Sequence, residues 1–112
     1  MFVDQPIGVG WSPQGNETNV SSTAEAGDDF YKFITTFYSL KNFTMLHKYD
    51  LYLAGESYAG SYIPVFAQKI IENNGVTPIP LKGTLCSNTH SFQIGIIIGD
   101  GWTHPEAQAQ YN

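Results

Sequence analysis

One serine set among small residues is the clearest candidate for chemistry in this chain. Ser57 lies within residues 55–60, which read GESYAG. A serine hydroxyl becomes a nucleophile for acyl transfer when a base removes its proton. The small neighbours permit a sharp backbone turn that pushes the hydroxyl outward, and the next N–H can then stabilise an oxyanion. Ser57 is therefore the candidate nucleophile, and the Tyr58 N–H is the candidate oxyanion donor.

The sequence predicts the elements that such a turn needs on both sides. An apolar run at residues 49–54 predicts a strand, and residues 61–72 carry apolar side chains at helical spacing. A helix that begins just after the serine brings unpaired N–H groups and a positive dipole to the same place. Because a GxSxG pattern alone is common in loops, its position between a strand and a helix is what makes it informative.

Further elements are predicted on both sides of this unit. Ser22 and Glu25 form a capping-box pattern, and core-type aromatic and aliphatic residues then recur at helical spacing through residues 23–40. Residues 1–4 read as the end of a buried strand, 96–98 as another strand, and 106–110 as the start of a helix. We expect Pro64 in the first turn of its helix and a left-handed ending at residues 73–75.

Three motifs together carry a family resemblance. Residues 2–12 read FVDQPIGVGWS, residues 55–63 read GESYAGSYI, and residues 98–105 read IGDGWTHP. In this order they resemble the serine carboxypeptidases, a branch of the α/β-hydrolase fold. The resemblance implies an α/β fold with a mostly parallel sheet and flanking helices. Because that family's domain is several times longer, we interpret residues 1–112 as a fragment of one such domain, an incomplete α/β-hydrolase fold.

The resemblance also implies roles for residues of the turn. It implies a serine-type carboxypeptidase that removes C-terminal residues from peptides through an acyl-enzyme on Ser57. Glu56 would bind the terminal carboxylate of the peptide, which requires a shared proton and favours mildly acidic pH. The alternative is a structural Glu56 that binds backbone amides of the turn. The implied partner is a peptide or protein with a free C-terminus, and no cofactor is implied.

The base and acid of a triad are not evident in the sequence. Asp100 and His104 follow Ser57 in the order expected of this fold, but they stand four residues apart in one loop. The fold takes its acid and base from different loops, so the resemblance places the true pair beyond Asn112 and the second oxyanion donor before Met1. We therefore expect this chain alone to be inactive.

The sequence departs from the family pattern near its end. The resemblance would place asparagine at position 100 and aspartate at position 104. Residues 84–95 interrupt the approach to the last strand, which indicates an insertion or the product of an unusual gene model. Cys86 and His90 within it do not make a metal site, because two ligands are too few, and His47 is expected at the surface. We therefore predict no metal.

The charge and the apolar runs of the sequence bear on the partners of the protein. Ten acidic residues against five lysines give a net charge of −5, which argues against nucleic acid and anionic membranes. No apolar run is long enough for a membrane span, and residues 1–6 lack the pattern of a signal peptide. Cys86 is the single cysteine, so it has no intramolecular disulfide partner.

Three glycosylation sequons begin at Asn16, Asn19 and Asn42. They favour a parent protein of the secretory pathway, in the lysosome or vacuole or outside the cell, although such triplets also arise by chance. Two other functions stay open: an acyltransferase or esterase on the same scaffold, and a non-catalytic truncated remnant. Whether the parent protein cleaves esters or peptides would distinguish the acyltransferase or esterase from a peptidase.

Overall fold

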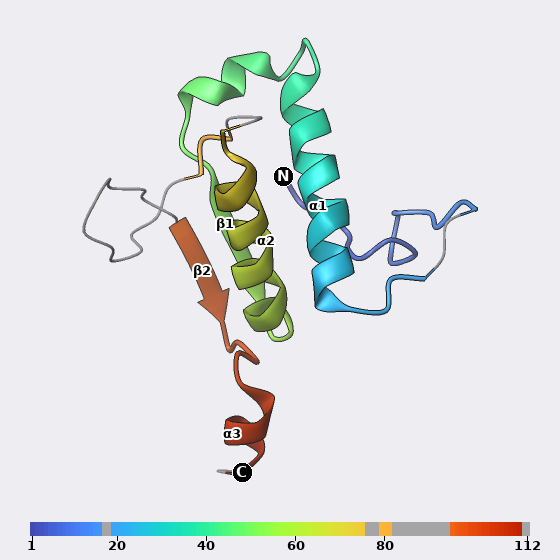
Figure 1. Cartoon of the computed structure of the whole chain (residues 1–112), viewed down its shortest axis with the longest axis vertical. Coiled ribbons are helices and arrows are strands. Elements are labelled where there is room, and N and C mark those ends of the chain that lie inside the picture. The colour runs from blue at the N-terminus through green and yellow to red at the C-terminus, as the bar shows by residue number, and fades with distance from the viewer. Residues whose placement is uncertain (17–18, 76–78, 82–94, 111–112) are drawn as a thin grey trace.

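The computed structural model describes residues 1–16, 19–75, 79–81 and 95–110. Its elements are α1 (Thr23–Ser39), the 3-10 helix η1 (Thr44–Lys48), β1 (Tyr52–Glu56), α2 (Ala59–Asn73), β2 (Gly95–Gly99) and α3 (Pro105–Gln110). Strands β1 and β2 form a parallel pair, and α2 lies in the connection between them (Figure 1). This βαβ arrangement agrees with the predicted α/β class.

The ladder along β1 extends past the start of β2 to an earlier residue of the chain, Leu81. Tyr52 pairs with Gly95 and Glu56 with Gly99, while Leu51, one residue earlier, pairs with Leu81. The N–H of Leu51 donates to the Pro80 carbonyl at 2.7 Å. The Ser57 N–H, past the end of β1, donates to Gly99 of β2. Alternate N–H groups of a strand point the same way, so the Leu51 bond lies on the same edge of β1 as the Ser57 bond, the edge that faces β2. Leu81 therefore occupies the place in the ladder directly before Gly95.

This register corrects the predicted insertion. Gly95 is the first residue of β2 and not the last residue of an inserted segment. Residues 84–94, with Cys86 and His90, lie outside the described residues. The ladder passes from Leu81 to Gly95 in a single step, so the segment that interrupts it is residues 82–94.

The core lies between α1, α2 and the sheet. Its buried members are apolar and come from both helices, from β1 and from the 79–81 segment: Ala26, Ile34, Tyr38, Leu53, Ile63, Phe66, Ala67, Ile70 and Ile79. The rings of Phe30 and Phe66 stack with centroids 4.2 Å apart. The helical stripe predicted for residues 23–40 is thus mostly buried, although Phe33 at its margin is exposed.

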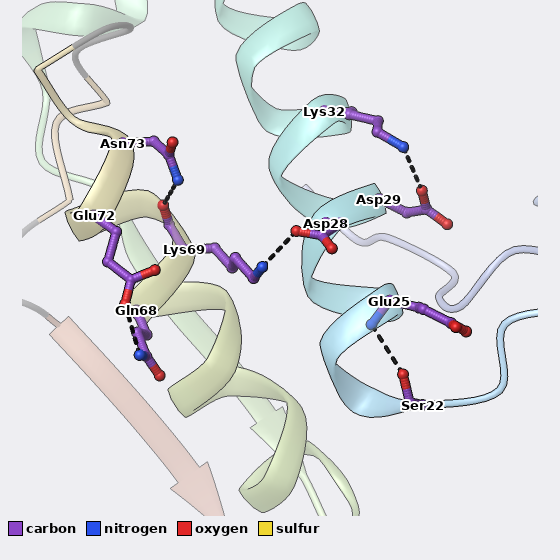
Figure 2. A network of polar contacts seen from close by, with 9 residues as sticks. All are labelled: Ser22, Glu25, Asp28, Asp29, Lys32, Gln68, Lys69, Glu72 and Asn73. Carbon is purple, nitrogen blue, oxygen red and sulfur yellow. Dashed lines mark hydrogen bonds and ion pairs between the residues drawn. The ribbon is translucent and has the colours of Figure 1, made fainter.

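Polar contacts join the two helices outside the core. Lys69 of α2 and Asp28 of α1 form an ion pair at 2.6 Å (Figure 2). At the start of α1 the Glu25 N–H donates to the Ser22 hydroxyl at 3.2 Å, as predicted for a capping box. The Glu25 carboxylate binds one residue further back than predicted, because it accepts from the N–H and hydroxyl of Ser21.

Three local predictions were wrong. Residues 1–4 form no strand, because none of the described strands pairs with them through backbone hydrogen bonds. Helix α2 begins at Ala59, so Pro64 falls in its second turn, at an exposed position. Asn74 keeps a right-handed conformation at the end of α2 and uses its side-chain oxygen to accept from the Ile79 N–H at 2.7 Å.

Candidate active site

Ser57 lies at a strained turn between β1 and α2. The strand ends at Glu56, the helix begins at Ala59, and Ser57 has a φ of 56°. This left-handed conformation costs a residue with a side chain about 1–2 kcal/mol. The side chain is exposed, and no described residue forms a hydrogen bond with its hydroxyl. The predicted sharp turn is thus present, and we call residues 55–60 the elbow.

Backbone hydrogen bonds hold Ser57 in this conformation. Its N–H donates to the Gly99 carbonyl at 3.1 Å, which continues the ladder past the end of β1. Its carbonyl accepts from the N–H groups of Gly60 at 2.9 Å and Trp102 at 2.8 Å. One of these three bonds is to the last residue of β2 and another is to the segment after it, so residues 99–102 fix the backbone of Ser57.

The elbow has no room for side chains at two glycines. A Cβ at Gly55 would lie 2.5 Å from the Ala59 Cβ. A Cβ at Gly60 would lie 2.8 Å from the Trp102 nitrogen and 2.9 Å from the Gly101 carbonyl carbon. These contacts supply the physical reason for the small residues that the sequence pattern indicated.

The segment after β2 is itself anchored to α2 and α3. The Ser61 hydroxyl donates to the Trp102 carbonyl at 2.7 Å, and the Gln108 amide donates to the Gly101 carbonyl at 3.0 Å. Asp100 has a φ of 44°, so the chain turns sharply here as well. Sequence spacing does not predict either contact, so Ser61 and Gln108 are site residues that only the structure identifies.

The Tyr58 N–H is available at the start of α2. Tyr58 is the N-cap residue of this helix, and no described residue accepts a hydrogen bond from its N–H. Its side chain is 46% exposed, and its ring lies 4.8 Å from the ring of Tyr62 and 6.4 Å from that of Trp102. An unpaired N–H beside a serine hydroxyl, at the positive end of a helix, can stabilise a developing oxyanion.

Comparison with known proteins agrees with this geometry. The family model described as serine carboxypeptidase matches residues 1–112. The chain belongs to the serine carboxypeptidase family. It is 40% identical over 109 residues to the pheromone-processing carboxypeptidase KEX1 of Ogataea parapolymorpha, and 40% identical over 111 residues to the carboxypeptidase Y homolog A of Sordaria macrospora.

These serine carboxypeptidases are much longer than the chain. The match covers 97% of this chain and 15% of the Ogataea protein, and 99% of this chain and 17% of the Sordaria protein. The chain thus spans about one sixth of the length of these relatives.

Among the described helices, none has the length and apolarity needed to cross a bilayer.

Glu56 stands next to Ser57, the candidate nucleophile, with its side chain exposed. No described residue forms a hydrogen bond or ion pair with its carboxylate. The structural alternative, in which Glu56 binds amides of the elbow, therefore finds no such bond among the described residues. An exposed carboxyl group beside Ser57, unpaired among the described residues, is free to meet a ligand.

Asp100 and His104 do not complete a catalytic site around Ser57. The Nδ1 atom of His104 accepts from the Ala107 N–H at 3.1 Å, so this ring caps α3. Asp100 is exposed and forms no hydrogen bond with Ser57. In the described part of the chain, no group of three or more His, Cys, Asp or Glu residues is placed to hold a metal. His47 is exposed, as predicted.

Proposed function

We infer that this chain is the nucleophile-bearing part of a serine-type carboxypeptidase. The observation that carries the proposal is the elbow: Ser57 is exposed at a φ of 56°, beside an unpaired Tyr58 N–H. Membership of the serine carboxypeptidase family supports the peptide bond as the target. The substrate is a peptide or protein with a free C-terminus, and the parent protein acts in the secretory pathway.

The chemistry follows from the positions of these groups. The Ser57 oxygen attacks the carbonyl carbon of the last peptide bond while a base takes its proton. The Tyr58 N–H donates to the oxyanion that forms, and the C–N bond then breaks and releases the C-terminal residue. Water hydrolyses the remaining ester on Ser57. The base and its carboxylate partner lie in sequence outside residues 1–112, so the chain alone does not turn over substrate.

In this proposal, Glu56 makes binding specific for peptides with a free C-terminus. A protonated Glu56 carboxyl can share its proton with the terminal carboxylate of the peptide. An amidated C-terminus has no carboxylate to share this proton, so Glu56 should favour a free C-terminus over an amidated one.

The experiment that tests the proposal uses a chimera, because among the described residues neither Asp100 nor His104 completes a catalytic site with Ser57. This chain replaces the matched segment of the Ogataea parapolymorpha carboxypeptidase, and labelling by a fluorophosphonate probe and release of C-terminal residues are measured. The chimera should be labelled and should cleave peptides, its Ser57→Ala variant should do neither, and the chain alone should not be labelled. A folded chimera that stays unlabelled while the relative reacts would overturn the proposal.

Two further outcomes separate the alternatives. A labelled chimera that cleaves esters and leaves peptides intact would assign the elbow to an esterase. Labelling of the isolated chain, lost in Ser57→Ala, would place the base within these 112 residues. In the active chimera, Glu56→Gln should raise KM for peptides with a free C-terminus more than for amidated ones.

A further inference from the structure

The three sequons differ in their surroundings. The sequon that begins at Asn16 runs into residues outside the described part of the chain. At Asn19 the side-chain oxygen accepts from the Gln14 amide at 2.7 Å, and its sequon ends at Ser21, whose N–H and hydroxyl both bind Glu25. The second sequon is thus part of the N-terminal cap of α1.

Asn42 is less engaged than Asn19. It lies in the turn between α1 and η1, is exposed, and forms no side-chain hydrogen bond with any described residue. The N–H groups of Phe43 and Thr44 both donate to the Leu40 carbonyl, at 2.8 and 3.1 Å. The backbone of this sequon is therefore fixed while its asparagine is free to carry a bulky group.

Exposed apolar side chains lie close to Asn42 in the chain. Leu40 is 49% exposed, Met45 is 59% exposed, and Phe43 stacks on Phe37 with ring centroids 4.4 Å apart. Exposed apolar side chains gathered in one place favour aggregation unless something covers them. An attached glycan is bulky and solubilising, and its sugar rings have apolar faces that can lie on such side chains.

We propose that Asn42 carries an N-linked glycan that lies over Leu40, Phe43 and Met45. The proposal rests on the proposed passage through the secretory lumen and does not depend on the peptidase chemistry. Attachment at Asn42 leaves the described contacts of the turn in place, because none of them uses its side chain.

The site is tested on the full chain, preceded by a cleavable signal peptide and secreted from yeast. A reporter sequon on a flexible tail after Asn112 records entry into the lumen. Asn42→Gln and Thr44→Ala should each lose one glycan, and Thr44→Ser should keep it. An Asn42 found unmodified by peptide mass spectrometry, in molecules whose reporter is glycosylated, would overturn the proposal without bearing on the peptidase.

A separate measurement, the binding of a hydrophobic dye, tests whether the glycan lies over the apolar side chains. Secreted Asn42→Gln should bind more of a hydrophobic dye than the secreted wild type. The same two proteins made in bacteria, which lack the glycan, should bind equal amounts. Equal dye binding by the secreted pair would show that the glycan leaves Leu40, Phe43 and Met45 uncovered.

Discussion

The elbow and the N-terminal segment, residues 1–16, keep their shapes by different means. The elbow is fixed by bonds to distant parts of the chain, from Gly99 and Trp102, and by backbones packed too closely for a Cβ. The described bonds of residues 4–12 join that segment to itself: Asp4 accepts from the Trp11 N–H and the Ser12 hydroxyl.

The N-terminal segment is also packed more loosely than the elbow. Phe2 is fully exposed, Trp11 is 95% exposed, and a cavity of about 460 Å³ separates residues 1–5 from β1, α1 and α2. The Gln5 side-chain oxygen is buried at this cavity and has no hydrogen-bond partner among the described residues. A motif built from local bonds has little packing to stabilise it, so we expect this segment to open before the elbow does.

Substitution at Gly60 should give the largest change in stability. In Gly60→Ala the new methyl group would meet the backbone of Gly101 and Trp102, which cannot move without breaking the bond to Ser57. We expect the free energy of unfolding in urea to fall by about 1–3 kcal/mol or more. Gly75→Ala is the matched control, because a Cβ there meets nothing within 4 Å.

The N-terminal segment sets the lower end of the same scale. Phe2→Ala removes a side chain that is already in solvent, so the free energy of unfolding should change by less than about 0.5 kcal/mol. If Phe2→Ala cost as much as Gly60→Ala, residues 1–5 would be packed in solution and the contrast between the two regions would be wrong.

Removal of residues 82–94 should change stability less than Gly60→Ala does. Leu81 and Gly95 pair with consecutive residues of β1, so a direct peptide bond between them continues the strand in register. Closure entropy changes slowly with the length of a connection, and we expect the free energy of unfolding to change by less than about 1 kcal/mol.

A second deletion sharpens this test of the register. Removing residues 83–94 leaves Lys82 as one extra residue, which shifts the alternation of side chains along β2 to the opposite face. This variant should be clearly less stable than the first in urea. Equal stabilities would mean that Leu81 does not take the ladder position before Gly95.

The local features of the site could be predicted from sequence because they follow from neighbouring residues. The helix after Ser57 and the cap at Ser22 depend on side chains within a few positions. The small residues around Ser57 indicate the turn, although bonds to the distant Gly99 and Trp102 hold it. The family resemblance was confirmed by the match of the family model over the whole chain. The role of Tyr58 as an oxyanion donor and that of Glu56 in substrate binding stay predictions.

The errors arose where distant contacts decide the structure. Residues 1–4 have the composition of a strand, but a strand needs a partner, and none of the described strands pairs with them. The boundary at Gly95 is set by the register against Tyr52, which a polar run cannot indicate. Asn74 stays right-handed because its side chain binds Ile79, and the contact between Ser61 and Trp102 joins residues 41 positions apart.

The cap of α1 should give a small change in stability that depends on pH. Hydrogen bonds from the Ser21 N–H and hydroxyl lower the pKa of Glu25 below its ordinary value of 4.5, because they favour the ionised form. This stabilisation is complete above pH 4.5 and is lost as pH falls through the lowered pKa. Glu25→Gln should therefore lower the unfolding midpoint near neutral pH and approach the wild type in acid, whereas a constant difference at all pH values would exclude the ionised carboxylate as the cause.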